Sequence, residues 1–240
     1  AAQDGSTFRI GAHATYPLNG DWEKKSLGYG AQVVWQLGDS AFLELSGTVL
    51  KDEWTKDSVL EADTEVDLPG DIEDYANQYS DSSQADRAIS EGNALSGDTK
   101  IADLDMVHIA ITLGFEFELS DALKAYAGGG INYNTFDVSY DERDLIQAAG
   151  YDPSYADYLG VANVKVNIDI DPAIGFHGCV GCELALGEGF QLFAEYRYVM
   201  INKISGKTEF SGSYGGYSYS NSIEGEDKMK TGFARAGVNF

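Results

Sequence analysis

Residues 164–186 read VKVNIDIDPAIGFHGCVGCELAL, and this segment alternates along its whole length between two kinds of side chain. Its even positions are mostly apolar, from Val164 to Leu186, whereas its odd positions are polar, charged or small. A period of two residues places successive side chains on opposite faces of a β-strand. The segment is therefore expected to form one long strand between two different environments.

Seven other segments repeat this two-face pattern. The eight expected strands lie at residues 8–16, 27–37, 41–50, 106–119, 123–138, 164–186, 190–201 and 229–240. The connections alternate in length: tight turns lie at 38–40, 120–122 and 187–189, and long polar loops at 17–26, 51–105, 141–163 and about 202–228. Short turns at one end and long loops at the other are typical of outer-membrane β-barrels.

The pattern predicts an all-β fold, an eight-stranded antiparallel transmembrane up-and-down β-barrel that forms a single domain over residues 1–240. The polar face is rich in glycine and in charges of both signs, which suit a narrow barrel interior. Aromatic residues on the apolar face fall at two levels, as in the two aromatic girdles of a membrane barrel. The first level holds Phe8, Trp35, Phe117 and Phe240, and the second holds Tyr16, Tyr29, Tyr133, Phe176 and Tyr198.

Composition excludes several other classes of protein. With 16 Lys and Arg against 39 Asp and Glu, the net charge of −23 argues against a nucleic-acid partner, because such binding relies on basic groups. No run approaches the roughly 18 apolar residues that a transmembrane helix needs. The first residues, Ala1-Ala2-Gln3, resemble a chain from which a signal peptide has been removed, so we expect an exported protein.

Three stretches carry a resemblance to a known family. They are residues 178–189 (GCVGCELALGEG), residues 190–198 (FQLFAEYRY) and the last eight residues (FARAGVNF). The chain resembles the small eight-stranded outer-membrane barrels, the OmpA/OmpX/OmpW-like β-barrel domain family. The resemblance implies a bacterial outer-membrane location with periplasmic termini and extracellular loops, and it implies that Phe240 is read as an assembly signal. The family includes anchors, adhesins, small-solute channels and a few lipid-modifying enzymes, so the fold alone does not define a function.

Charged and histidine side chains of the polar face are the candidate lumen residues. They are expected to form an interior network or to line a pore: Arg9, His13, Glu44, His108, Glu116, Lys124, His177, Glu195, Arg197 and Arg235. With Glu118 and Glu183 also on this face, acids and bases are nearly balanced, which favours ion pairs that close the lumen over a selectivity ring of one sign. The histidines are expected to join this hydrogen-bonded network, and a metal or proton-relay site is the alternative.

The two cysteines, Cys179 and Cys182, are three positions apart. On a regular strand they point to opposite faces, Cys179 into the lumen and Cys182 toward lipid. We expect two small apolar side chains there. A disulfide, which would need a β-bulge at Gly181, is the first alternative, and metal or cofactor attachment is the second.

The segment 55–105 holds 14 acidic and 3 basic residues, nearly half of the net charge. A cluster in it is a candidate site for Ca²⁺, or for divalent ions bridging to lipopolysaccharide phosphates: Glu61, Asp63, Glu65, Asp67, Asp71, Glu73 and Asp74. The cluster lacks EF-hand spacing, and a solvated acidic loop is the simpler interpretation. Tyrosines in the later loops suit protein or glycan contacts.

These features favour a non-enzymatic surface protein, in which the barrel anchors acidic, tyrosine-rich loops for surface contacts or envelope integrity. A narrow channel for small or apolar solutes is the alternative, and a barrel subunit of a larger outer-membrane assembly is the third. No histidine is expected on the lipid face, where a lipid-acting enzyme would need one. The expected partners are outer-membrane lipid and lipopolysaccharide, and no cofactor is expected beyond the possible calcium.

Overall fold

A computed structural model describes residues 8–20, 26–55, 100–140, 165–187, 189–214 and 217–240. The regular structure of these residues consists of nine strands. They are β1 (Phe8–Gly20), β2 (Gly28–Gln36), β3 (Ala41–Thr55), β4 (Lys100–Glu118), β5 (Leu123–Tyr140), β6 (Lys165–Ile170), β7 (Ala173–Gly187), β8 (Phe190–Tyr214) and β9 (Tyr217–Asn239). Within the described residues, no helix is long and apolar enough to cross a membrane.

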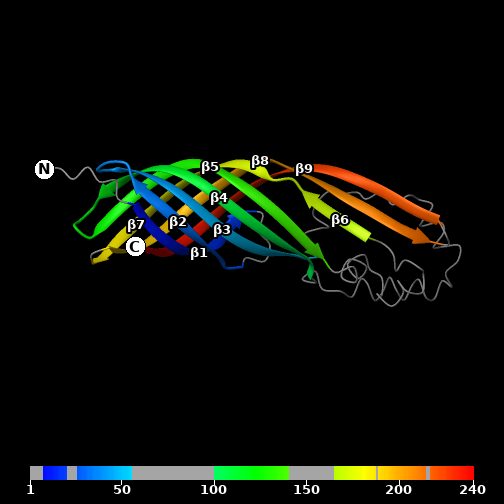
Figure 1. Ribbon diagram of the computed structural model, residues 1–240, viewed down its shortest axis with the longest axis horizontal. Helices are drawn as coiled ribbons and strands as arrows, with labels where there is room; N and C mark the ends of the chain where they lie inside the picture. Colours follow the sequence, from blue (N-terminus) through cyan, green and yellow to red (C-terminus); the bar gives the residue numbers. More distant parts are fainter. Residues whose placement is uncertain (1–7, 21–25, 56–99, 141–164, 188, 215–216) are drawn as a thin grey trace.

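Eight of these strands close into a ring of antiparallel pairs (Figure 1). Strands β1 to β4 each pair with the next strand, β5 pairs with β7, and β8 pairs with both β7 and β9. The ring closes where β9 pairs with β1, for example at Ala14 and Ala236. The predicted eight-stranded antiparallel barrel is therefore confirmed.

The segment expected to form one strand over residues 164–186 is divided into β6 and β7. Both pieces pair with β8 in one continuous register, from Phe176 opposite Met200 to Ile170 opposite Gly206. The division falls at Pro172, because proline has no N–H to donate to a neighbouring strand. Pairing with β5 ends at Ala173, so β6 continues beyond the barrel wall on β8 alone.

The expected loop over residues 202–228 is mostly β-structure instead. Strands β8 and β9 continue as a hairpin, paired from Ile204 and Asp227 to Tyr214 and Tyr217, past a register shift between Ile201 and Ile204. The hairpin projects far beyond the barrel at the end opposite to the tight turns, with β6 beside it (Figure 1). Strands β3 and β4 also run further than expected, to Thr55 and from Lys100.

The barrel interior is the core of the molecule. Side chains in much of the barrel wall alternate between buried inward positions and exposed outward positions, most clearly in the β7 segment from Ala173 to Glu183. Large apolar residues cover the outside, and Leu113 and Phe115 are each more than half exposed. The charged face points inward, as its glycines and mixed charges predict, and the apolar face points outward.

Candidate functional site

The ten candidate lumen residues come together inside the barrel from seven of its strands. Eight of them are buried, and Arg9 and Lys124 are partly exposed at the tight-turn end. Glu118 differs from the expectation, since it is exposed at the rim of the barrel, where β4 ends. The alternation therefore identified which side chains share the interior, and the structure shows how they pair.

The turn end of the lumen is closed by a cluster around Arg9. One guanidinium nitrogen of Arg9 lies 2.7 Å from a Glu116 oxygen, and the other lies 2.6 Å from a Glu183 oxygen. Lys124 Nζ lies 3.0 Å from the second oxygen of Glu116. The cluster thus neutralises two acids with two bases, and its strands β1, β4, β5 and β7 are fixed relative to one another.

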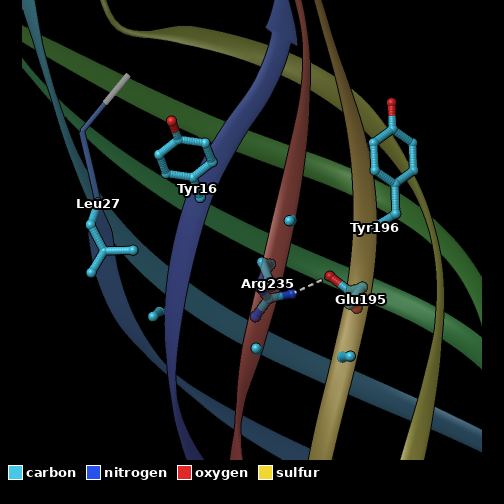
Figure 2. Close-up of a pocket in the computed structure, with 9 residues that line it drawn as sticks. Tyr16, Leu27, Glu195, Tyr196 and Arg235 are labelled. Carbon is cyan, nitrogen blue, oxygen red and sulfur yellow. Dashed lines mark hydrogen bonds and ion pairs between the residues drawn. The ribbon is translucent and has the colours of Figure 1, made fainter. Parts of the chain in front are cut away.

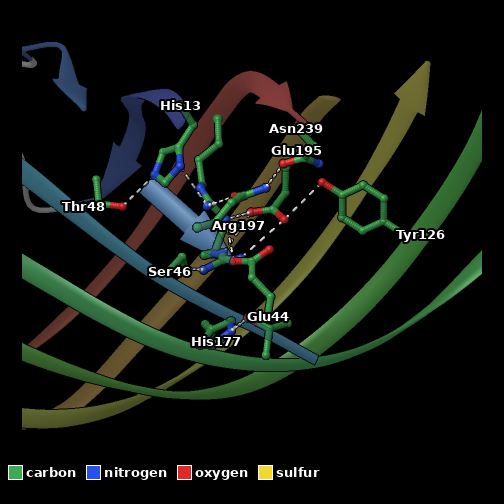
Figure 3. Close-up of polar contacts among 12 residues, drawn as sticks. His13, Glu44, Ser46, Thr48, Tyr126, His177, Glu195, Arg197 and Asn239 are labelled. Carbon is green, nitrogen blue, oxygen red and sulfur yellow. Dashed lines mark hydrogen bonds and ion pairs between the residues drawn. The ribbon is translucent and has the colours of Figure 1, made fainter. Parts of the chain in front are cut away.

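The centre of the lumen holds two arginines and two glutamates in alternating contact (Figure 3). Arg197 lies 2.8 Å from Glu44 and 2.9 Å from Glu195, measured between nitrogen and carboxylate oxygen. Arg235 lies 2.6 Å from the same oxygen of Glu195 and 3.3 Å from Glu44. All four residues are at most 5% exposed, so each charge depends on its partners more than on solvent.

Neutral donors and acceptors satisfy further positions of this central cluster. Arg197 Nη1 donates to Ser46 Oγ at 3.1 Å, Arg235 Nη2 donates to Gln32 Oε1 at 2.8 Å, and the Tyr126 hydroxyl donates to Glu195 at 3.2 Å. Hydrogen bonds of this kind are what a buried ion cluster needs for stability.

The three histidines lie in the same interior and bind different neighbours. His13 Nε2 lies 2.9 Å from Thr48 Oγ1, and its Nδ1 faces Arg235 at 3.3 Å. Because arginine only donates, Nδ1 of His13 is the acceptor and Nε2 carries the hydrogen. The other two rings are also hydrogen-bonded. His108 Nδ1 lies 2.7 Å from Asn134 Oδ1, and His177 Nε2 lies 2.8 Å from Thr112 Oγ1.

The histidines do not converge on a common centre. The rings of His108 and His177 are 6.5 Å apart between centroids. Among the described residues, no group of three or more His, Cys, Asp or Glu is arranged to hold a metal ion. The observed contacts are those of an interior hydrogen-bond network.

An apolar cluster fills the lumen on the loop side of the histidines, and the sequence interpretation missed it. Its buried members are Leu50, Met106, Ala173, Val199, Ile201, Met229 and Phe233. The signal was present in the alternation, because Val199 and Ile201 continue the inward positions of Glu195 and Arg197 on β8. The sequence interpretation assigned only polar and small residues to the lumen, so it could not identify apolar residues that point inward.

Little open space separates these clusters. A cavity between the Arg9 cluster and the central cluster has a volume of about 10 Å³. Its lining includes Gln32, Val34, Phe42 and Tyr126 as well as the charged groups. That volume is about the least that admits a single water molecule.

The remaining expectations concern residues outside the lumen clusters. Cys179 is buried and Cys182 is exposed, and both are free thiols, as the strand geometry predicts. Phe240 is exposed, and its main chain exchanges two hydrogen bonds with Ile10, which ties the end of the chain to β1. The acidic cluster from Glu61 to Asp74 lies outside the described residues.

Comparison with known proteins identifies the family of this barrel. The model of the outer membrane protein β-barrel domain family matches residues 1–240, so the chain belongs to that family. A comparison with curated proteins finds no match.

Two solved structures of similar fold are small outer-membrane proteins. OprG from Pseudomonas aeruginosa is 13% identical with a TM-score of 0.53, and the match covers 96% of this chain and 94% of OprG. Neisserial surface protein A is 14% identical with a TM-score of 0.52, and the match covers 98% of both chains. These likenesses show the fold alone. The assignment to outer-membrane β-barrels rests on the family match.

Proposed function

We propose that this protein is a closed, non-enzymatic outer-membrane anchor. In this proposal the barrel holds the projecting β6–β8–β9 sheet and the acidic connection between β3 and β4 at the cell surface. There they make surface contacts or support envelope integrity, with lipopolysaccharide and a protein or glycan as partners. The loops are extracellular and the termini periplasmic in this arrangement.

The filled lumen is the observation that supports this proposal. From the turn end to the loop end, the interior passes through the Arg9 cluster, the central ion cluster, the histidine contacts and the apolar cluster. An eight-stranded barrel has an interior that side chains can just fill. A solute that crossed this lumen would have to break buried ion pairs and displace Phe233 and Met106 as well.

The positions of the histidines support the non-enzymatic part of the proposal. His13, His108 and His177 are each at most 5% exposed and point inward. A lipid substrate approaches a barrel from outside, where none of these imidazoles reaches it. A general base at the bilayer surface would have to come from elsewhere in the chain.

Conductance in a planar lipid bilayer tests the closed barrel against the alternative of a narrow channel. We expect the refolded parent protein to give no discrete current steps after insertion. Insertion is verified by heat-modifiable migration of the same sample in detergent electrophoresis. Steps in the parent that change size in Arg197→Ala would place a solute path in the lumen and contradict the proposal.

A further inference from the structure

The outer face of β8, β9 and β1 is hollowed to a groove of about 470 Å³ (Figure 2). Its floor consists of four alanines, Ala14, Ala194, Ala234 and Ala236. Tyr16 and Leu27 form one side of the groove and Tyr196 forms the other. Glu195 and Arg235 border it with their main chain, since their side chains pair inside the barrel.

Strand register explains why the groove lies here. Ala236 of β9 is opposite Ala14 of β1 on one side and opposite Ala194 of β8 on the other. Ala234, the next outward residue of β9 toward the loop end, lies between Tyr16 and Tyr196. Three adjacent strands therefore present methyl groups at one level, with bulky side chains on either side.

Polar groups close the groove at its loop end. Gly232 is the next outward residue of β9 after Ala234, and a Cβ there would overlap the Tyr196 hydroxyl and the Asn19 carboxamide oxygen. These two polar groups therefore lie against the bare backbone at Gly232. The surface changes at that point from methyl groups to hydrogen-bonding groups.

Two lysines follow on the same outward face of β9. Lys230 and Lys228 are both exposed and alternate with the buried Met229. Ten residues separate Lys230 from Phe240, which is about 33 Å along the strand. At a strand tilt of about 40° this is about 25 Å along the barrel axis, the height of the apolar band of such barrels. The lysines therefore lie at the level of lipid headgroups.

We propose that this groove binds an anionic, phosphate-bearing lipid of the surrounding membrane. An acyl chain lies over the alanine floor, the Tyr196 hydroxyl and Asn19 face the ester region, and the phosphate lies at Lys228 and Lys230. The charge of the lysine pair is complementary to a phosphate, in a chain whose net charge is −23. The proposal goes beyond the closed-anchor function and does not depend on which end of the barrel faces outward.

A second copy of the chain fits the groove less well than an acyl chain. A two-fold dimer through this face would place one alanine floor against the other. The projecting Tyr16 and Tyr196 would hold the two floors apart and leave a void, which close-packed interfaces avoid. A slender acyl chain enters the groove without moving these side chains.

Native mass spectrometry of the refolded full chain tests the proposal. The protein in detergent micelles is offered equal amounts of phosphatidylglycerol and phosphatidylcholine with identical acyl chains. We expect the parent to retain one phosphatidylglycerol at least tenfold in preference to phosphatidylcholine. In the double variant Lys228→Gln/Lys230→Gln this preference should disappear, because each lysine contributes roughly fivefold. In Ala236→Phe, which fills the groove, retention of both lipids should fall.

Matched variants outside the groove, on the neighbouring strands β2 and β3, provide the controls. Ala31→Phe adds the same bulk at an exposed alanine of β2, and Lys51→Gln removes an exposed lysine at the loop end of β3. Both should bind lipid like the parent, and heat-modifiable migration verifies the fold of every variant. Equal retention of the two lipids by the parent, or an unchanged preference in the lysine variant, would overturn the proposal. A parent dimer that Ala236→Phe converts to a monomer with unchanged lipid retention would assign the groove to a second copy instead.

Discussion

At the residue scale, the central cluster joins charges that are far apart in the sequence. Arg197 and Glu44 are separated by 153 positions, and Arg235 and Glu44 by 191. Each glutamate contacts both arginines, so the loss of any one of the four side chains removes a partner from both charges of opposite sign. The cluster therefore links strands β3, β8 and β9 across the lumen as well as along the wall.

Removing Arg197 should be strongly destabilising for this reason. Arg197→Ala leaves two buried carboxylates with the single guanidinium of Arg235, and we expect the free energy of unfolding to fall by about 3–5 kcal/mol. Urea unfolding in lipid vesicles, followed by tryptophan fluorescence, measures the change. Lys203→Ala is the control, because its exposed pair with Glu226 lies on the projecting hairpin. A parent-like midpoint for Arg197→Ala would show that the cluster contributes nothing to stability.

The inward direction of these side chains was predictable from the sequence, whereas their partners were not. Period-two alternation fixes the face of Arg197 as soon as β8 is recognised. Its contacts with Glu44 and Ser46 depend on how the ring closes and on the stagger of its strands, which local patterns do not encode. The same limit explains why the three imidazoles could be placed in the lumen but not paired.

At the scale of the strands, alternation located the eight membrane strands well and their loop-side ends poorly. A barrel strand alternates because one face meets lipid and the other meets the lumen. Beyond the barrel wall neither face of β8 and β9 meets lipid, and this region carries exposed ion pairs such as Lys207 with Glu209. The pattern therefore fades at about Ile201 although the hydrogen-bonded ladder continues to Tyr214.

The projecting part of the β8–β9 hairpin should be dispensable for barrel folding. Closure of the ring uses β9 residues 231–239 against β1 and 229–239 against β8, all within the barrel. We expect a variant in which residues 205–226 are replaced by an Asn-Gly turn to keep heat-modifiable migration and a parent-like thermal midpoint. A variant that remains unfolded in detergent would show that the hairpin is needed for barrel formation.

At the scale of the whole molecule, the surface is divided between two solvents. The barrel wall presents large apolar side chains outward while its charged groups are paired inside. Much of the net charge of −23 belongs to residues 56–99, the segment between β3 and β4, which holds 12 acidic residues. An outer wall of large apolar side chains is stable only when a bilayer surrounds the barrel.

The cost of a lysine on the outer wall should therefore depend on its depth. Leu113 of β4 is 52% exposed. It lies midway between Phe117, at one aromatic level, and Ile109, which is paired with Tyr133 at the other level. Leu113→Lys should lower the free energy of unfolding in lipid vesicles by about 2–4 kcal/mol, because the ammonium group must enter the middle of the apolar band. Leu119→Lys, at the exposed turn end, should cost about 0–1 kcal/mol. Equal effects at the two positions would contradict the placement of the band, since a barrel wall in water would accept a lysine at either depth.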